Sequence, residues 1–299
     1  MAQEVVIVPM QEIFVPEEKR YIKAQFSCPH GSRLPQLIIM LHGLYSCMEK
    51  SSQMALARTY QDAGYATLRA NFMGHGERHK SEGNIENTNI TSNLYDVKAL
   101  WNYAQKDLAE WIDPSNIAIS ASSYGALVSL IALEKKIISP ESMVLMAPFW
   151  LDAYQKPALL PASLLAKLMP RSVLDALLTP VLQKVFPELE ARHVHPALIS
   201  DFLKHHTRSL KRPELLSNTS AIALMCGTKD WVSPISQAEK FRDRVNRQNA
   251  KGPFIDNQQV KLYPLEIEHD NIPPEDSNKR NQLAVQFIQR TRALRAKTI

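Results

Sequence analysis

Short apolar runs recur along the chain, each of a length typical of a strand that is buried on both faces. Segments between them place apolar residues at three- and four-residue steps, which is the spacing of one helix face. Since strands and helices alternate, the pattern predicts an α/β fold with a mostly parallel central sheet and helices on both faces. The predicted strands are residues 37–41, 66–70, 117–120, 143–146, 221–226 and 260–263, and the clearest helix carries Leu94, Val97, Leu100, Trp101, Ala104 and Leu108.

The two ends of the chain depart from this alternation. Residues 5–8, 12–15 and 21–27 have the pattern of short strands, separated by Pro9 and Pro16, which predicts an antiparallel edge of the sheet. The chain closes with a predicted amphipathic helix that contains Leu283, Phe287, Ile288 and Leu294.

Residues 151–216 lose the strand pattern, and prolines divide them into short amphipathic segments. Such segments cannot bury their apolar faces alone, so we expect a helical cap on the carboxyl edge of the sheet, where open α/β sheets bind ligands. This predicts a core of residues 1–150 and 217–299 with the cap as an insertion. Some apolar cap residues either line an acyl-chain channel or pack on the core: Leu159, Leu160, Leu164, Leu165, Leu168 and Met169.

Composition excludes several classes of protein. The 299 residues are 45% hydrophobic and 22% charged, with a mean hydropathy of -0.23, which excludes disordered and fibrous chains. The apolar stretch at residues 117–133 is interrupted by serines and a glycine, and it is shorter than the roughly 20 apolar residues that span a bilayer. Residues 1–20 have four glutamates and no basic segment. We therefore expect no membrane insertion, no signal peptide and a cytoplasmic protein.

Charge, cysteines and histidines exclude further classes. The net charge of +5 is mild, and basic residues lie in mixed runs such as 239–244, so no nucleic-acid surface is expected. Three cysteines without a CxxC motif predict neither a disulfide framework nor a zinc cluster. No segment resembles a phosphate-binding loop, so no cofactor is expected. No metal is expected either, because acidic and cysteine partners at helical spacing are lacking around His193, His195, His205 and His206.

Residues 117–131 have the pattern of a strand, a turn of small residues and a helix, which is the setting of a nucleophile elbow. An elbow strains the backbone of its serine and crowds its neighbours, so the positions two before and two after must be small. Ala121 and Gly125 meet this requirement for Ser123. Ser122 as nucleophile would need a small residue where a tyrosine stands. Ser123 is therefore the predicted nucleophile.

Two glycine-containing turns follow predicted strands. Leu44 comes after a His-Gly turn at the end of the first buried run. Because two donors are needed where negative charge develops, we assign the oxyanion hole to the backbone amides of Leu44 and Tyr124. His42 is expected to brace this turn. The turn at residues 71–76 is expected to be structural, so His75 is not the predicted base.

Candidates for the acid and the base of a serine triad follow two later predicted strands. Asp230 follows a buried run, and His269 follows the last predicted strand. This produces the chain order Ser, Asp, His, and no other histidine follows Asp230. Glu239, inside a predicted helix, and Asp270, next to the histidine, are the alternative acids.

Together these motifs resemble the α/β-hydrolase family over nearly the whole chain, and the resemblance implies a Ser-His-Asp esterase or lipase mechanism. It involves Leu41-His42-Gly43, Gly74-His75-Gly76, the elbow at Ser123, Gly227-Thr228-Lys229-Asp230 and His269. Residues 41–129 are similar to capped monoacylglycerol lipases and cinnamoyl esterases. A narrower similarity, to the bacterial bioluminescence acyltransferase, an acyl-carrier-protein thioesterase, involves Ala121 and residues 201–206, 217–220, 230–232 and 261–263.

Three classes of function stay open at this point. The first is an oxygen-ester hydrolase that acts on acyl glycerols, lysophospholipids or aryl esters. The second is an acyl thioesterase or acyltransferase, and the third is a peptidase or a non-catalytic binding module on the same fold. In an enzyme of this kind, His269 would take the Ser123 proton and Asp230 would orient the imidazole. The expected partner is a small acyl ester or thioester, and the sequence does not indicate an oligomeric state.

Overall fold

The structure is a computed structural model that describes residues 5–31, 34–148, 216, 220–230, 233–248, 259–268 and 272–296. The predicted cap, residues 151–216, lies outside these ranges except for Leu216, which is buried in the core. His269 lies outside them as well. The division into core and cap therefore stays a prediction.

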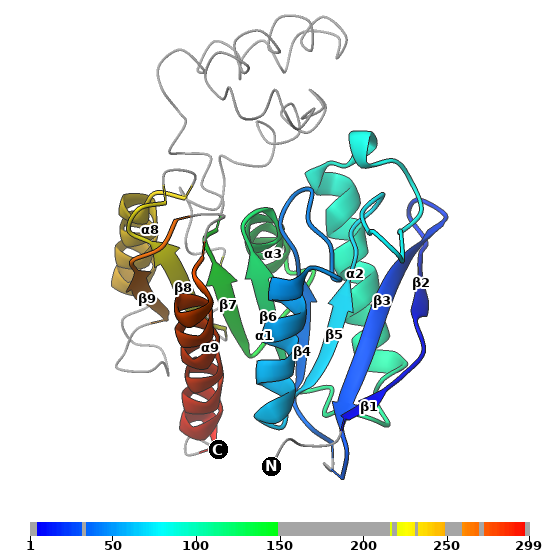
Figure 1. Cartoon of the computed structure of the whole chain (residues 1–299), viewed down its shortest axis with the longest axis horizontal. Helices are drawn as coiled ribbons and strands as arrows, with labels where there is room; N and C mark the ends of the chain where they lie inside the picture. The colour runs from blue at the N-terminus through cyan, green and yellow to red at the C-terminus, as the bar shows by residue number, and fades with distance from the viewer. Residues whose placement is uncertain are drawn as a thin grey trace, which may run out of the picture.

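Six parallel strands form most of a nine-stranded sheet (Figure 1): β4 (Leu37–Leu41), β5 (Ala66–Ala70), β6 (Ile117–Ser122), β7 (Ser142–Met146), β8 (Ala221–Gly227) and β9 (Val260–Leu265). They lie in the order β5-β4-β6-β7-β8-β9. Every apolar run that predicted a parallel strand lies in one of them. All residues of β4, β7 and β8 are buried, as expected for strands that helices cover on both faces.

The N-terminal strands form the predicted antiparallel edge. They are β1 (Val5–Ile7), β2 (Gln11–Val15) and β3 (Arg20–Pro29). β3 pairs antiparallel with β5, and both β1 and β2 pair antiparallel with β3. The edge prediction is thus confirmed, with β3 longer than the sequence pattern indicated.

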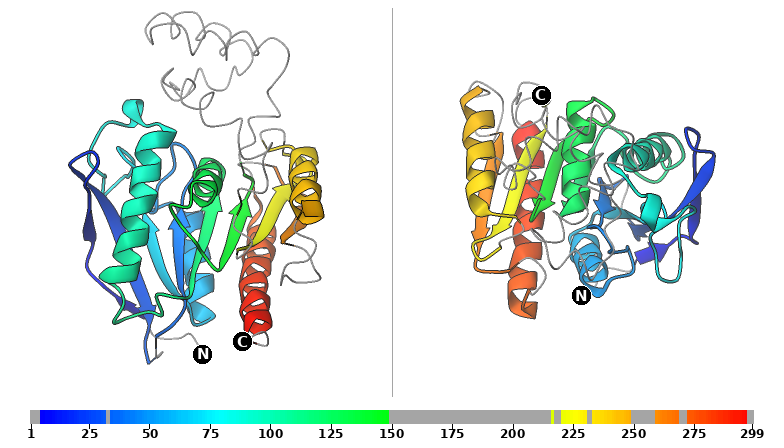
Figure 2. Two further views of the ribbon diagram at one scale, coloured as in Figure 1. Left: turned by 180° about the vertical axis from the view of Figure 1, so that it is seen from behind. Right: turned by 90° about the horizontal axis from the view of Figure 1, so that it is seen from above.

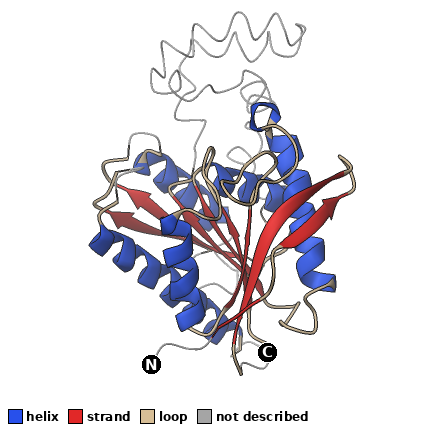
Figure 3. Cartoon of the chain, turned by 45° about the vertical axis from the view of Figure 1, so that its right-hand side comes forward, coloured by secondary structure: helices blue, strands red, loops and turns tan. Residues whose placement is uncertain are grey.

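Helices cover both faces of the sheet, as predicted (Figures 2 and 3). Apolar residues of α1 (Ser51–Asp62) and α9 (Pro274–Arg295) share one hydrophobic cluster with the strands. Those of α2 (Ile90–Lys106), α3 (Tyr124–Glu134) and α8 (Ile235–Gln248) belong to a second cluster. Figure 1 shows α1 and α9 in front of the sheet and the other three helices behind it. This layering leaves the carboxyl edge of the sheet to the loops.

Helix α2 shows how local sequence sets an element. The side chain of Asn89 accepts a hydrogen bond from the Ser92 amide at 2.9 Å and so caps the first turn. The helix ends at Lys106, before Leu108, which the periodicity placed in it. The amides of Asp107 and Leu108 both donate to the Tyr103 carbonyl, at 2.8 and 3.2 Å, a pattern that closes a helix. Leu108 is nevertheless buried, so the apolar pattern predicted burial correctly and the helix end wrongly.

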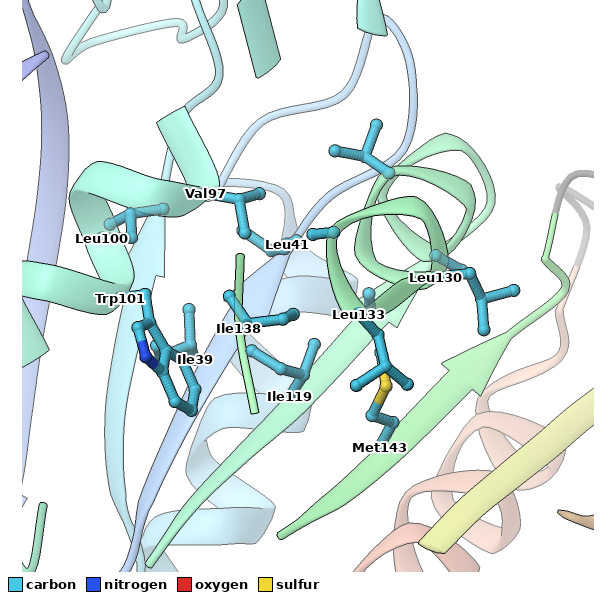
Figure 4. Packing of buried hydrophobic residues seen from close by; sticks show 14 of the residues in the cluster. Ile39, Leu41, Val97, Leu100, Trp101, Ile119, Leu130, Leu133, Ile138 and Met143 are labelled. Atoms are coloured by element: carbon cyan, nitrogen blue, oxygen red, sulfur yellow. The ribbon is translucent and has the colours of Figure 1, made fainter. Parts of the chain in front are cut away.

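The larger core cluster lies between the sheet and the helices α2 and α3 (Figure 4). Apolar side chains from β4, β6 and β7 meet those of the two helices there, and nearly all are less than 5% exposed. This packing fixes α2 and α3 relative to the ends of β4 and β6. Residues labelled in Figure 4 are Ile39, Leu41, Val97, Leu100, Trp101, Ile119, Leu130, Leu133, Ile138 and Met143.

Candidate active site

Unusual backbone conformations gather in the loops that follow four neighbouring strands, β5, β4, β6 and β7. Gly74, Tyr45, Ser123 and Ala147 have φ angles of 71°, 56°, 48° and 44°. Because parallel strands end at the same edge, these loops adjoin one another at the upper edge of the sheet in Figure 1. For non-glycine residues such conformations cost about 1 to 3 kcal/mol each and cluster at functional sites.

Ser123 forms the sharp turn between β6 and α3. Its φ of 48° and ψ of -115° are a conformation that residues with a side chain rarely adopt. Its amide donates to the Met146 carbonyl at 2.8 Å, and its carbonyl accepts from the Ala126 amide at 3.1 Å. The structure thus has the strand, turn and helix that the sequence predicts around Ser123, whose side chain is half-buried at the sheet edge.

Gly125 permits a close approach between α3 and the end of β4. A Cβ atom at this position would lie 2.5 Å from the His42 carbonyl oxygen and 2.9 Å from that of Leu41. Real side chains do not make such short contacts with backbone. The need for a small residue two positions after Ser123 therefore has a direct structural cause.

The turn at residues 43–46, here called the Gly43 turn, lies directly beside Ser123. A Cβ atom on Gly43 would come within 3.3 Å of the Ser123 Cβ and 3.9 Å of its Oγ. The Ser46 amide closes the turn by donating to the Gly43 carbonyl at 3.2 Å. Within the described part of the chain, the Leu44 amide has no hydrogen-bond partner. Tyr124 supplies the first amide of α3, so both predicted oxyanion donors belong to segments that flank Ser123.

His42 braces the Gly43 turn, as expected from the sequence. Its Nδ1 lies 2.7 Å from the Gly43 carbonyl oxygen, and its Nε2 accepts the Phe72 amide at 3.1 Å. A carbonyl can only accept and an amide can only donate, so the ring is neutral with its proton on Nδ1. Burial, and the nearby His75, lower the pKa of His42 to about 3. With both nitrogens engaged, His42 has no free nitrogen to serve as a base for Ser123.

His75 braces the same turn from the loop after β5. Its Nδ1 lies 2.8 Å from the Met73 carbonyl oxygen, and its Nε2 accepts the Tyr45 amide at 3.3 Å. Burial lowers the pKa of His75 below the ordinary value for histidine. A Cβ atom on Gly74 would meet the Ile85 amide nitrogen at 2.3 Å, so this glycine serves close backbone packing. Both observations agree with a structural role for residues 71–76.

Asp230 is buried at the carboxyl end of β8. Its Oδ1 accepts the Ser233 amide at 2.7 Å, and the Ser233 hydroxyl donates to the Pro148 carbonyl at 2.5 Å. The carboxylate is therefore anchored to the loop that follows β7. Glu239, one alternative acid, is exposed on α8, and Asp270 lies outside the described residues.

The chain that leads to His269 packs against the chain that leads to Asp230. A Cβ atom on Gly227 would lie 2.2 Å from the Ile267 carbonyl oxygen, so the two segments touch through backbone. His269, two residues later, lies outside the described residues, and its contact with Asp230 stays a prediction. The histidines of the predicted cap also lie outside: His193, His195, His205 and His206.

Comparison with known proteins identifies the family. Residues 33–258 match the family described as serine aminopeptidase, S33. The chain belongs to this family. The match includes the Gly43 turn, Ser123 and Asp230, and it makes the protein a hydrolase. It does not include His269.

Solved structures show that this S33-family protein has the α/β-hydrolase fold. An esterase from Pyrococcus furiosus superposes with a TM-score of 0.65 at 18% identity, covering 97% of this chain and 91% of its own. Est1E from Butyrivibrio proteoclasticus, with ferulic acid bound, has a TM-score of 0.61 at 16% identity, covering 93% and 99%. Mouse alpha/beta hydrolase domain-containing protein 10 has a TM-score of 0.60 at 15% identity, covering 96% and 99%.

No curated protein is significantly similar to this sequence. Among the described helices, none is both long and apolar enough to cross a membrane. The described residues also contain no group of three side chains suited to hold a metal ion. The cytoplasmic location stays a prediction.

Three buried polar residues near the site of the S33-family protein were not predicted from the sequence: Asn71, Asn93 and Asp96. Asn71 directly follows β5 and connects it to the segment after the Gly43 turn, since its Oδ1 accepts the Met48 amide at 2.7 Å. Asn93 and Asp96 lie on the buried side of α2 with 0% exposure. The sequence does contain a signal for Asn93 and Asp96. Both stand four residues before members of the apolar helix face, where a polar side chain is unusual.

Proposed function

We propose that the protein is a serine hydrolase that cleaves a carboxylic ester of an acyl chain. The observation that carries the proposal is the strained turn at Ser123, directly beside Gly43 and at the N-terminus of α3. A hydroxyl held there can attack a carbonyl while backbone amides of both segments face the developing oxyanion. The structural similarity to the Pyrococcus furiosus esterase supports the ester as substrate.

The proposed mechanism passes through an acyl-enzyme. His269 takes the Ser123 proton as general base, and Asp230 orients the imidazole and stabilises its cation. The amides of Leu44 and Tyr124 hold the oxyanion of each tetrahedral intermediate. Water then attacks the acyl-enzyme with His269 again as base, which releases the acid. The proposed enzyme requires no metal or cofactor.

Aminopeptidase activity is the second candidate, because the family description names it. The same triad can attack an amide, so the reacting residues would not change. Substrate choice depends on the groups that receive the amine or the acyl chain. A thioesterase or acyltransferase activity, suggested by the sequence resemblance, would use the same residues on a thioester.

The test is a panel of initial rates with acyl oxygen esters, acyl thioesters and aminoacyl anilides over several chain lengths. We expect oxygen esters to react fastest and Ser123→Ala to lower kcat about 10³-fold or more. Ser122→Ala is the matched control, because it removes the neighbouring hydroxyl and should cost far less. A loss of turnover in Ser122→Ala instead would move the nucleophile by one residue. A preference for anilides or thioesters would replace the ester assignment.

Two further readouts separate an enzyme from a binding module. A serine-directed phosphonate should label the native protein at Ser123 and leave Ser123→Ala unlabelled. Turnover should rise with pH through about 6.5, the ordinary pKa of the proposed base. A native protein that is not labelled would favour a binding role, and a flat rate from pH 5 to 8 would remove His269 from the mechanism.

A further inference from the structure

A buried hydrogen-bond network connects α2 to the residue after the predicted nucleophile. The Tyr124 hydroxyl donates to Asn93 Oδ1 at 2.6 Å, and the Thr88 hydroxyl donates to the same oxygen at 3.1 Å. Asn93 Nδ2 donates to Asp96 Oδ2 at 3.0 Å. Asn93, Asp96 and Thr88 are at most 1% exposed. The side chain of Tyr124 is therefore held at its far end while its amide begins α3.

The same network continues to the loop after β5. Asp96 Oδ2 also accepts the Met73 amide at 2.9 Å, and its Oδ1 accepts from the Arg20 guanidinium at 2.5 Å. Both carboxylate oxygens are thus used, in a site with no solvent contact. Burial raises the pKa of Asp96, and the charge of Arg20 opposes this rise.

The loop after β5 in turn holds the Gly43 turn. Two consecutive backbone amides of this loop bind different partners. The Phe72 amide donates to His42 Nε2, and the Met73 amide donates to the Asp96 carboxylate. His75 extends the connection, because it binds the Met73 carbonyl and accepts the Tyr45 amide. A chain of hydrogen bonds therefore runs from Tyr124 through α2 and this loop to the residues on both sides of Leu44.

We propose that Asn93 and Asp96 are positioning residues that set the distance between the two oxyanion-hole amides, those of Leu44 and Tyr124. The proposal rests on the proposed function. An oxyanion hole works only when both donors reach the same developing oxygen at about 2.7 to 3.1 Å. The two amides belong to loops after different strands, so sheet pairing alone does not determine their spacing. The network joins those loops through groups that cannot exchange their partners for water.

Variants that break this network should lower kcat and leave KM nearly unchanged, since the oxyanion develops only as the transition state forms. Tyr124→Phe removes one hydroxyl and keeps the amide donor. We expect it to lower kcat about 10-fold with KM within about twofold. Asn93→Ala should lower kcat about 30-fold, and the double variant should be no slower than Asn93→Ala, because both changes break one connection.

A matched control separates positioning from loss of stability. Gln61→Leu removes a buried side-chain hydrogen bond, the one to the Thr67 hydroxyl at 2.8 Å, at the opposite end of β5 from the site. It should lower the melting temperature but leave kcat and the rate of phosphonate labelling at wild-type values. Tyr124→Phe and Asn93→Ala should slow that labelling in proportion to kcat, because the phosphonate adduct also places an oxygen in the hole.

The outcomes distinguish this proposal from the function on which it rests. Native protein that is not labelled at Ser123 overturns both. Labelled native protein with wild-type kcat in folded Tyr124→Phe and Asn93→Ala overturns the positioning role alone. An equal fall of kcat in Gln61→Leu at a matched loss of melting temperature overturns it as well. If Asn93→Ala does not fold, Tyr124→Phe and Thr88→Val carry the same test.

Discussion

At the scale of single residues, the site depends on the strained backbone of Ser123 and on neutral, buried imidazoles. Ser123 stands at φ 48°, where glycine is preferred, and yet carries a side chain. His42 is 1% exposed and uses both nitrogens in hydrogen bonds to backbone. The backbone strain at Ser123 opposes folding, and the low pKa of the His42 imidazole opposes folding in acid. Each feature therefore leads to a stability prediction.

Replacing Ser123 by glycine should stabilise the protein while it abolishes turnover. Relief of a strain of about 1 to 3 kcal/mol outweighs the extra chain entropy of glycine, about 0.5 to 1 kcal/mol. We expect the free energy of unfolding in urea to rise by about 1 kcal/mol. Ser122→Gly, one residue earlier in β6, is the control and should destabilise by a similar amount. Equal losses in both variants would show that the Ser123 turn is not strained.

Acid should destabilise the protein through His42. The pKa of His42 is about 3 in the folded state, against about 6.5 in an unfolded chain. The unfolded state therefore binds the proton first, so stability is complete above pH 6.5 and falls as the pH drops toward 3. This one group should remove about 2 kcal/mol between pH 7 and pH 5. Urea unfolding at both pH values measures the loss, with His75 acting in the same direction.

Two variants test the assignment of that acid sensitivity. His42→Gln should show a smaller loss between pH 7 and pH 5, because glutamine does not titrate. His30→Gln changes an exposed histidine and should keep the wild-type loss. An unchanged loss in His42→Gln would mean that other groups cause the sensitivity.

At the scale of elements, the contact between β4 and α3 brings the Gly43 turn against the elbow. Two glycines, Gly125 and Gly43, lie at this contact, and they differ in how much space an added Cβ atom would have. A Cβ on Gly125 would clash with two backbone oxygens, whereas one on Gly43 would meet the Ser123 Cβ at 3.3 Å and would lie at an ordinary 3.8 Å from the Ser122 carbonyl oxygen. The backbone oxygens that face Gly125 cannot move aside unless α3 shifts, whereas the Ser123 side chain that faces Gly43 can adjust slightly.

The two glycines should therefore respond differently to alanine. Gly125→Ala should destabilise by about 2 kcal/mol or more, because α3 must shift from β4. Gly43→Ala should cost less than about 1 kcal/mol in unfolding free energy but lower kcat about 10-fold, since its methyl presses on the Ser123 Cβ and so displaces the hydroxyl that this carbon carries. Urea unfolding and initial rates on both variants provide the comparison. Comparable stability losses would contradict the geometry of this contact.

At the scale of the whole molecule, ion pairs attach the antiparallel edge to the α2 layer. Arg20, at the start of β3, pairs with Asp96, and both side chains are at most 8% exposed. Glu17, just before β3, pairs with Lys98 on the same helix, but these side chains are 25% and 50% exposed. The two pairs join the same layers in different dielectric surroundings.

Breaking the buried pair should cost far more than breaking the exposed one. Arg20→Met leaves the Asp96 carboxylate buried without its counter-charge, and we expect a loss of about 3 kcal/mol. Lys98→Met should cost no more than about 0.5 kcal/mol, because solvent screens that pair. Urea unfolding of both variants measures the difference. A small loss in Arg20→Met would indicate that Asp96 takes up a proton at little cost.

The sequence by itself determined much of this fold and part of the candidate site. Apolar runs identified the parallel strands because burial on both faces leaves a continuous local pattern. The position of Ser123 followed from Ala121 and Gly125, because the tight turn limits side-chain size at fixed sequence offsets. The helix of residues 90–106 was recognised by its period, but its end at Lys106 was not, because the apolar period continues to Leu108.

Only the tertiary structure decided which loops meet. The order β5-β4-β6 places the loops after residues 41, 70 and 122 side by side, and no local pattern encodes that order. The network of Arg20, Met73, Asn93, Asp96 and Tyr124 depends on this neighbourhood, since its members come from separate strands, loops and helices. Periodicity reports which face of an element is buried, whereas a buried polar partner is found only where two elements pack together.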